Sequence, residues 1–248
     1  MNIFLSGLAR GLVWSVTSCA LLAGSTVYGI VEQTKQEILD DLTVGGPSSV
    51  NAATDAMADP ADSLWSLAAV GGSVETVIIE LASFADQNKF GIWDATDPSK
   101  RVQVFDGGAS ASTQGVVSIM GDGSVKVNFA DTGIDFAGNL FGFYLESPQG
   151  VFYSDTSLNS DGFDHMMAYQ GTGDLIQLPG YLPGIWTGTE YMLFWEDLLN
   201  GGDMDHNDFV VLVDSVVPVP EPATYALLGS CLLFAGVARR RKLAQKVA

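Results

Sequence analysis

Short apolar runs separated by turn-forming residues fill the middle of this chain, and this alternation is the feature that most limits its fold. The runs are rich in Val, Ile, Phe and Tyr, which favour β-strands. Gly and Asp between them, as at residues 106–108 and 121–123, suit tight turns between antiparallel strands. We therefore predict a mainly β fold, an antiparallel β-sandwich or jelly-roll-like domain. Its expected strands cover residues 73–82, 101–105, 115–120, 124–129, 140–146, 150–154, 165–170, 174–178, 191–196 and 208–213.

The sequence predicts four consecutive parts: a signal peptide, a short helix with a linker, the β-sandwich domain and a C-terminal targeting segment, at residues 1–29, 30–63, 64–215 and 216–248. A short surface helix is expected within residues 31–42, because its apolar side chains share one helical face: Val31, Ile38, Leu39 and Leu42. Residues 43–62 are rich in Gly, Pro, Ser, Ala and Asp and show almost no periodicity, which is typical of a loop or linker.

The central part of the chain is strongly acidic. The protein has 29 Asp and Glu against 11 Lys and Arg, and only five of those cations lie between residues 30 and 222. Such a body repels nucleic acid and anionic lipid, and it attracts cations. Both cysteines, Cys19 and Cys231, lie in terminal apolar stretches, so neither a disulfide nor a cysteine-rich zinc site holds the body together.

The N-terminal segment has the pattern of a secretory signal peptide. One cation, Arg10, precedes an apolar run that reaches about Ala23, and no acidic residue occurs before Glu32. This predicts passage through the Sec translocon and cleavage by signal peptidase near Gly29, or between Ala23 and Ser25. A retained anchor helix and a lipoprotein signal that ends at Cys19 are the alternatives.

The C-terminal segment predicts one transmembrane helix, over about residues 223–238. Such a helix spans about 24 Å at ~1.5 Å per residue, so it is short for a hydrocarbon core of about 30 Å. Arginine side chains that reach the interface make up some of the difference. The cations at Arg239, Arg240, Arg241 and Lys242 should remain cytoplasmic, which places the body on the other side. An ordinary single-pass anchor is the alternative to a transient one.

The stretch "VPEPATYALLG" followed by "RRRK" resembles a PEP-CTERM sorting signal. Its three parts are the Pro220-Glu221-Pro222 motif, the apolar run and the basic cluster Arg239, Arg240 and Arg241. The resemblance implies recognition by an exosortase and cleavage near the motif. The protein would be anchored transiently in the inner membrane of a Gram-negative bacterium and then reach the cell surface or the extracellular space. Such bacteria often make extracellular polysaccharide.

The stretch richest in potential metal ligands is a loop with five carboxylates. It separates two apolar strands, 191–195 and 209–213, which should pair because the loop is short. Carboxylates gathered in this way repel each other unless a divalent cation binds them, and calcium prefers several hard oxygen ligands. The spacing is similar to the first half of an EF-hand loop but lacks its glycine and distal glutamate. A solvated acidic hairpin is the alternative. The candidate calcium ligands are Glu196, Asp197, Asp203, Asp205, Asn207 and Asp208.

The same stretch, "WEDLLNGGDMDHNDFVVLV", resembles the signature of domain of unknown function 4114, which occurs in secreted and surface bacterial proteins. The matching residues are Glu196, Asp197, Gly201, Gly202, Asp203, Asp205, Asn207 and Asp208, whereas His206 stands where an aromatic residue is common. The resemblance covers residues 130–215, and 70–215 on a wider reading. It implies a β-rich domain without an established activity, and it strengthens the calcium hypothesis.

The sequence carries no nucleophile elbow, no zinc-protease motif and no phosphate-binding loop, so we expect no enzymatic activity. Tyr181 and Trp186, in "YLPGIW", form the candidate ligand surface, because aromatic faces suit the apolar faces of sugars. We predict an exported cell-surface or extracellular-matrix protein, stabilised by calcium, with a structural or adhesive role linked to exopolysaccharide. A carbohydrate-binding module and, with two of its carboxylates as catalysts, a glycoside hydrolase are the alternatives.

Overall fold

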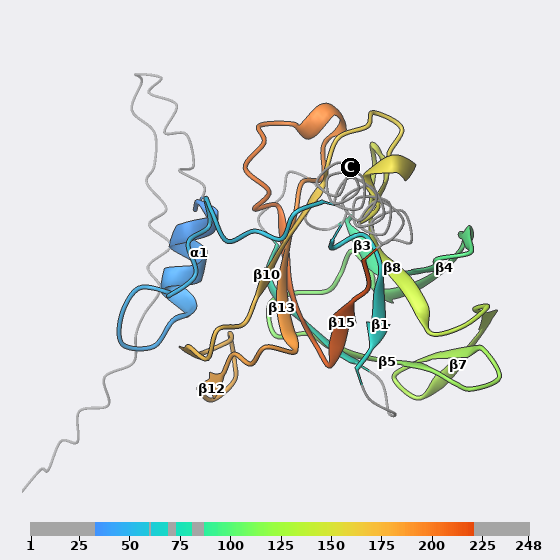
Figure 1. Ribbon diagram of the computed structural model, residues 1–248, viewed down its shortest axis with the longest axis horizontal. Helices are drawn as coiled ribbons and strands as arrows, with labels where there is room; N and C mark the ends of the chain where they lie inside the picture. The colour runs from blue at the N-terminus through green and yellow to red at the C-terminus, as the bar shows by residue number, and fades with distance from the viewer. Residues whose placement is uncertain (1–32, 60, 69–72, 81–86, 221–248) are drawn as a thin grey trace, which may run out of the picture. The chain divides into compact units, whose positions relative to one another are not determined.

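A computed structural model describes residues 33–59, 61–68, 73–80 and 87–220 of the chain (Figure 1). The predicted signal peptide, residues 1–29, and the predicted transmembrane helix, residues 223–238, lie outside this described part. Among the described residues, no helix is both long and apolar enough to cross a bilayer.

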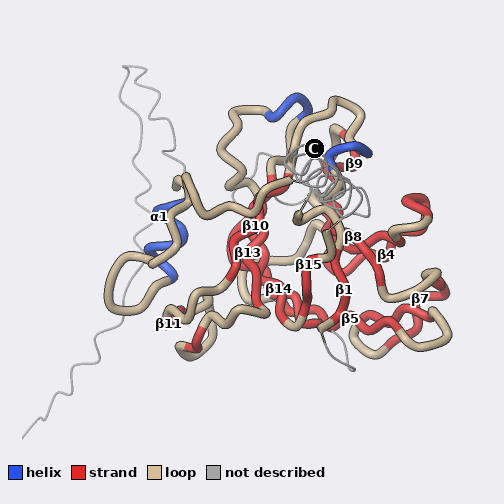
Figure 2. The backbone as a smooth tube through the Cα atoms, viewed as in Figure 1, coloured by secondary structure: helices blue, strands red, loops and turns tan. Residues whose placement is uncertain are grey.

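Two antiparallel sheets form the body, which confirms the predicted mainly β architecture (Figures 1 and 2). The first sheet has the order β15-β1-β8-β3-β4, and β9 pairs with the free part of β8. Its strands are β1 (Trp65–Leu67), β3 (Lys89–Asp94), β4 (Asp97–Phe105), β8 (Leu140–Ser147), β9 (Gly150–Tyr153) and β15 (Val216–Pro218).

The second sheet has the order β10-β13-β14-β2-β5-β6-β7. Its strands are β2 (Ser73–Glu80), β5 (Gln114–Ile119), β6 (Ser124–Val127), β7 (Ala130–Asp135), β10 (Met166–Gln170), β13 (Glu190–Trp195) and β14 (Phe209–Asp214). A small third sheet pairs β11 (Leu175–Ile176) with β12 (Gly184–Ile185). The described helical elements are α1 (Lys35–Leu42) and two single 3₁₀ turns, η1 (Thr156–Leu158) and η2 (Leu199–Gly201).

An aromatic core joins the two large sheets. Phe90 of β3 is fully buried and stacks on Phe143 of β8, with 5.6 Å between the ring centroids. The same ring stacks on Phe209 of β14 at 5.7 Å and meets Trp195 of β13 edge-on at 6.1 Å. Burial of one such side chain contributes roughly 1.5–3 kcal/mol, and aromatic pairs add about 0.5–1.5 kcal/mol. Phe90 therefore holds the first sheet against the ends of β13 and β14.

A second apolar layer covers the other face of β13 and β14. Met192, Phe194 and Val210 point to this side and are fully buried. Ile38 and Leu39 of α1 pack in the same cluster, and a capping box between Thr34 and Glu37 starts this helix. Burial on both faces explains why β13 and β14 are continuously apolar in sequence. The helix predicted within residues 31–42 is confirmed as α1.

The stretch after α1 has neither helix nor strand over residues 44–59, yet it is held against the sheet. The Met57 amide donates to the Ala168 carbonyl at 2.9 Å, and the Tyr169 hydroxyl donates to the Ala52 carbonyl at 2.8 Å. Both partners lie on β10, the edge strand of the second sheet. This loop therefore shields an edge that would otherwise expose unpaired backbone groups.

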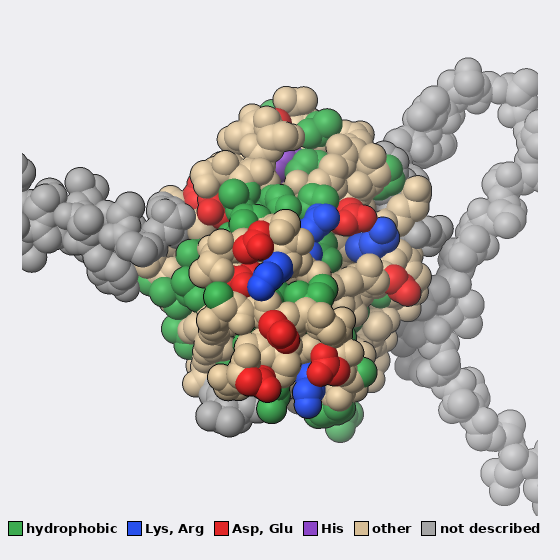
Figure 3. Space-filling view, turned by 90° about the vertical axis from the view of Figure 1, so that its right-hand side faces the viewer, with side chains coloured by type: hydrophobic (Ala, Val, Ile, Leu, Met, Phe, Trp, Pro, Cys, Tyr) green, Lys and Arg blue, Asp and Glu red, His purple; other side chains and the backbone are tan. Residues whose placement is uncertain are grey.

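Acidic and basic side chains are mixed on the face that carries β4 and β7, which Figure 3 turns toward the viewer. Lys89 and Arg101 both approach Glu146, at 2.8 and 3.6 Å. Exposed pairs of this kind add little stability.

The packing of α1 predicts a specific mutational result. Leu39→Ala should lower the free energy of unfolding by about 2–4 kcal/mol, because Leu39 is 1% exposed and its loss leaves a cavity under the helix. Asp41→Ala, on the exposed side of the same helix, is the matched control and should change it little. Urea unfolding of the purified variants measures both effects, and equal effects would show that α1 does not contribute to the core.

Candidate metal centre

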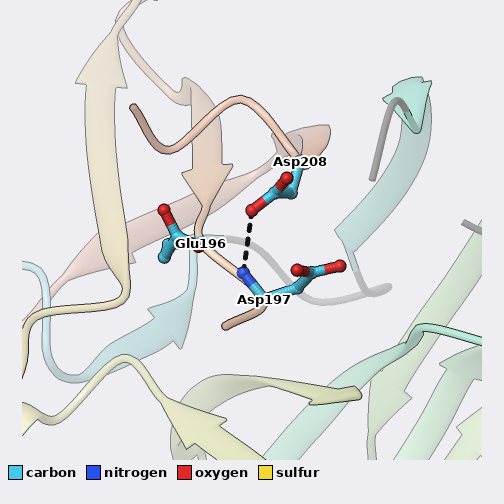
Figure 4. A group of neighbouring side chains, drawn as sticks. All are labelled: Glu196, Asp197 and Asp208. Carbon is cyan, nitrogen blue, oxygen red and sulfur yellow. Dashed lines mark hydrogen bonds between the residues drawn. The ribbon is translucent and has the colours of Figure 1, made fainter. Parts of the chain in front are cut away.

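The acidic loop connects two strands that pair directly. β13 and β14 are antiparallel, with Trp195 opposite Phe209, as the sequence predicts. The pairing brings Glu196 and Asp197, at the start of the loop, next to Asp208 at its end. The Asp197 amide donates to Asp208 Oδ2 at 3.0 Å, and Figure 4 shows Asp208 above the backbone that links the other two residues.

The five predicted carboxylates come together as two overlapping groups. Glu196, Asp197 and Asp208 are all buried, and each offers a carboxylate oxygen within 4.8 Å of those of the other two. Glu196 also groups, within the same distance, with Asp203 and Asp205, of which the first is exposed and the second is half-buried. Glu196 is therefore the residue that the two groups share.

Asn207, the sixth predicted ligand, lies beside these groups and is 1% exposed. Its amide nitrogen donates to Asp205 Oδ2 at 2.8 Å and to the Gln33 carbonyl at 2.6 Å. Its Oδ1 accepts no hydrogen bond from any described residue. The amide is thus oriented with its nitrogen occupied and its oxygen available.

Left-handed backbone shapes the tip of the loop. Met204 and His206 have φ values of 63° and 53°, on either side of Asp205. This conformation costs roughly 1–2 kcal/mol for a residue other than glycine. The backbone of the loop is therefore strained on both sides of Asp205. Gly202, with φ 44°, passes so close to Glu196 that an added Cβ would clash with Oε1. Gly201, with φ 76°, packs its backbone in the same way against the Phe163 ring.

Oxygen atoms without donors mark the interior of the centre. Oε1 of Glu196 accepts a hydrogen bond from the Leu198 amide at 3.2 Å, whereas Oε2 meets no donor among the described residues, although the side chain is fully buried. Asn88 is in a comparable position, because its nitrogen donates to Asp197 Oδ2 at 2.8 Å and its buried Oδ1 has no described partner. A buried acceptor without a partner costs about 1–3 kcal/mol, and a cation would relieve this cost.

Burial, together with the repulsion between neighbouring carboxylates, raises the pKa values of three groups in the loop. Burial raises the pKa of Glu196 to about 8, and the charge of Asp208 acts in the same direction. Burial also raises the pKa of Asp208, to about 6, and that of Asp205. Protons can therefore neutralise these groups, and a bound cation would replace them.

Among the described residues, Lys35 brings a positive charge to the cluster. The Lys35 ammonium, at the start of α1, donates to the Asp205 carbonyl. Burial lowers the pKa of Lys35, while the charges of Asp205 and Glu196 oppose this decrease. The ammonium offsets one of the negative charges and also ties the helix to the loop.

The donor set fits calcium better than zinc. The side chains offer carboxylate and amide oxygens, which calcium binds at 2.3–2.6 Å, so oxygens on opposite sides of one ion lie about 4.6–5.2 Å apart. Zinc prefers His and Cys. His206 turns away, with Nε2 at 2.8 Å from the Asp164 carbonyl. His165 instead holds the backbone of the site, because its Nδ1 lies 3.0 Å from the Glu196 carbonyl and its Nε2 lies 3.0 Å from Asp161.

The predicted ligand surface is wrong in one of its two residues. Tyr181 is 36% exposed, but Trp186 is fully buried in the second apolar layer, and its indole nitrogen donates to the Glu190 carbonyl at 3.2 Å. A buried indole cannot stack on a sugar. Trp65, Trp93 and Trp195 are buried as well, so none of these tryptophans offers a stacking surface.

Comparison with known families confirms both resemblances. Residues 116–216 match the model of a domain of unknown function (DUF4114), and residues 218–242 match the PEP-CTERM protein-sorting motif. The chain is therefore an exported protein of the class that an exosortase sorts. More particularly, it carries a PEP-CTERM sorting motif directly after a match to a domain whose description assigns no role. No curated protein and no solved structure matches it.

Two further carboxylates, the buried Asp62 and the half-buried Asp164, lie near each other outside the loop. Asp62 is 2% exposed, and its Oδ2 accepts no hydrogen bond from a described residue. Burial raises the pKa of Asp62 to about 8, and the nearby charge of Asp164 adds to the shift. The pKa of Asp164 itself is raised to about 6 by burial. Asp62 therefore remains protonated in the folded protein at pH values where the unfolded chain has released this proton.

This shift predicts a pH dependence of stability. The pKa of an aspartate is about 3.9 in the unfolded chain. When folding raises this pKa, the group contributes its full stabilisation only at pH values below about 3.9. Its contribution is lost as the pH rises from about 4 to about 8. Asp62→Asn removes this titration, so its melting temperature should fall less between pH 5 and pH 8 than that of the wild type. Melting in the presence of chelator measures the difference.

Asp106→Asn is the control for this experiment, because Asp106 is exposed and lies on another loop. Its melting temperature should follow that of the wild type at both pH values. Parallel curves for Asp62→Asn and the wild type would contradict the prediction.

Proposed function

We propose that this exported protein is a calcium-stabilised, non-enzymatic component of the cell surface or extracellular matrix. Its role would be structural or adhesive and linked to exopolysaccharide. The observation that carries the calcium proposal is the fully buried carboxylate of Glu196, whose Oε2 has no donor among the described residues and which lies within 4.8 Å of two separate pairs of carboxylates. A divalent cation would turn this repulsive arrangement into a stabilising one.

Export and calcium binding support each other. Extracellular calcium modules work with dissociation constants of about 10⁻⁴–10⁻³ M, which suits the calcium levels outside cells. A loop that is strained at Met204 and His206, and that carries uncompensated charge, would be ordered only after the protein reaches that environment. We therefore infer that the ion completes the fold after translocation.

The sorting motif adjoins the end of the sandwich. β15 ends at Pro218 and pairs with β1, and the Val219 amide still donates to the Leu64 carbonyl at 2.7 Å. Cleavage at Pro220-Glu221-Pro222 would leave every strand of the sandwich in place. Of the sorting residues, Glu221, Pro222 and Arg239–Arg241 lie outside the described part. We propose transient anchoring through residues 223–238 in the inner membrane of a Gram-negative bacterium, after Sec-dependent export and signal peptidase cleavage.

The position of the carboxylates argues against hydrolysis of a glycoside. Glu196, Asp197 and Asp208 are buried, and two cavities of about 1020 and 380 Å³ in the described part are lined by other residues. A hydrolase needs its two carboxylates on either side of an accessible bond. A carbohydrate-binding role loses its main support with the burial of Trp186.

Calcium should raise the melting temperature of the purified protein. One site saturated 100-fold above its dissociation constant contributes about 2.7 kcal/mol, or roughly 5–10 °C for a domain of this size. Glu196→Gln, which should weaken binding at least tenfold, should reduce the shift to about half or less. Asp106→Asn, an exposed carboxylate on another loop, should retain it. Equal melting temperatures with calcium and with chelator would rule out the calcium site.

Cleavage at the sorting motif should be visible in the secreted protein. Mass spectrometry of released material is expected to find a C-terminus close to Pro220, while Glu221→Ala should leave the intact chain in the membrane fraction. Val217→Ala, an exposed residue of β15, is the control and should be processed normally. Released protein that still carries residues 223–248 would contradict processing.

A further inference from the structure

We propose that the acidic loop holds two calcium ions and that Glu196 bridges them. A buried ion would lie among Glu196, Asp197 and Asp208, and an outer ion among Glu196, Asp203 and Asp205. This inference rests on the proposed calcium site and adds its stoichiometry and the separate roles of the two positions.

The geometry separates the ligands into two sets. Within each set of three, the ligand oxygens lie within 4.8 Å of one another, which matches the span of oxygens around one calcium ion. The five carboxylates do not form a single set at this distance. One ion therefore could not contact all five without movement of the loop, whereas two ions would use every carboxylate where it lies.

The shared carboxylate has the properties of a bridging ligand. Glu196 is fully buried, and its Oε2 has no donor among the described residues. A carboxylate has two oxygens and about four acceptor positions, so it can bind one ion through each oxygen. Asn207 Oδ1, which is also buried and lacks a described donor, is available as a neutral ligand next to Asp205.

The balance of charge also favours two ions. The two sets contain five carboxylates, and Lys35 contributes one positive charge at their edge. A single divalent ion would leave a net negative charge on a cluster whose three inner carboxylates are buried, and buried net charge is costly. Two divalent ions would supply the positive charge that brings the cluster close to neutrality.

The two positions would differ in exchange. The inner ion would have buried ligands, which include Asp197 and Asp208. It should therefore exchange slowly and act as part of the core. Asp203 is exposed and Asp205 is half-buried, so the outer ion should exchange rapidly with the medium. The outer ligands also lie on the strained tip of the loop, next to the contact with Lys35. The outer ion would therefore be the one that orders the loop tip.

The test counts calcium on the purified full-length protein. Equilibrium dialysis against calcium alone, followed by elemental analysis, should find two ions per chain. The double variant Asp203→Asn/Asp205→Asn should retain one ion, and it changes only residues outside the buried set. Asp208→Asn should also reduce the count by one, and Glu196→Gln should lower both affinities at least tenfold. Asp106→Asn should still bind two.

The outcomes separate this inference from the proposed function. A wild-type count of one, lost completely in Asp203→Asn/Asp205→Asn, would show one merged site, which refutes the two-ion arrangement while calcium binding stands. A count of zero would refute both. A double variant that still binds two ions would refute the outer position. If Asp208→Asn does not fold, the counts for the wild type and the double variant decide.

Discussion

The antiparallel pairing of β13 with β14 is the contact on which the rest of the molecule depends. It places Leu193 and Val211 in the core between the sheets, and Phe194 and Val210 in the layer under α1. The same register closes the acidic loop at its base, because Trp195 is opposite Phe209. The same strand pairing therefore stabilises the core and forms the candidate metal centre. It also supplies part of the energy that holds the mutually repelling carboxylates together.

The local part of the structure could be predicted from the sequence. Each of the ten expected strand regions contains a strand, and the convergence of five carboxylates followed from a short loop between two apolar strands. These features depend on residues close in sequence, where periodicity and turn chemistry are informative. Of the missed strands, β1, β12 and β15 are too short to show a pattern, and β7, "ADTGID", is polar and mostly exposed. β3 contains Gly91, which interrupts its apolar run because the Val102 carbonyl and Tyr144 pass directly over it.

Long-range contacts explain what could not be predicted. Asn88 bonds to Asp197, which is 109 residues away in sequence, and Lys35 bonds to Asp205, which is 170 residues away. The sequence of the loop itself therefore indicates neither partner. Trp186 is predicted to share a ligand surface with Tyr181, but its indole ring, which follows a Pro-Gly turn, packs in the second apolar layer. Such a turn fixes the path of the backbone, whereas the direction of the side chain depends on the apolar face beneath it.

The contacts of the loop with the start of α1 couple two distant parts of the chain. Asn207 holds the Gln33 carbonyl and Lys35 holds that of Asp205, so the loop tip and the first helical turn are tied together. If ions order this tip, the position of α1 would depend on the calcium concentration of the medium. A newly exported molecule would then order this part of its fold only outside the cell, where calcium is available.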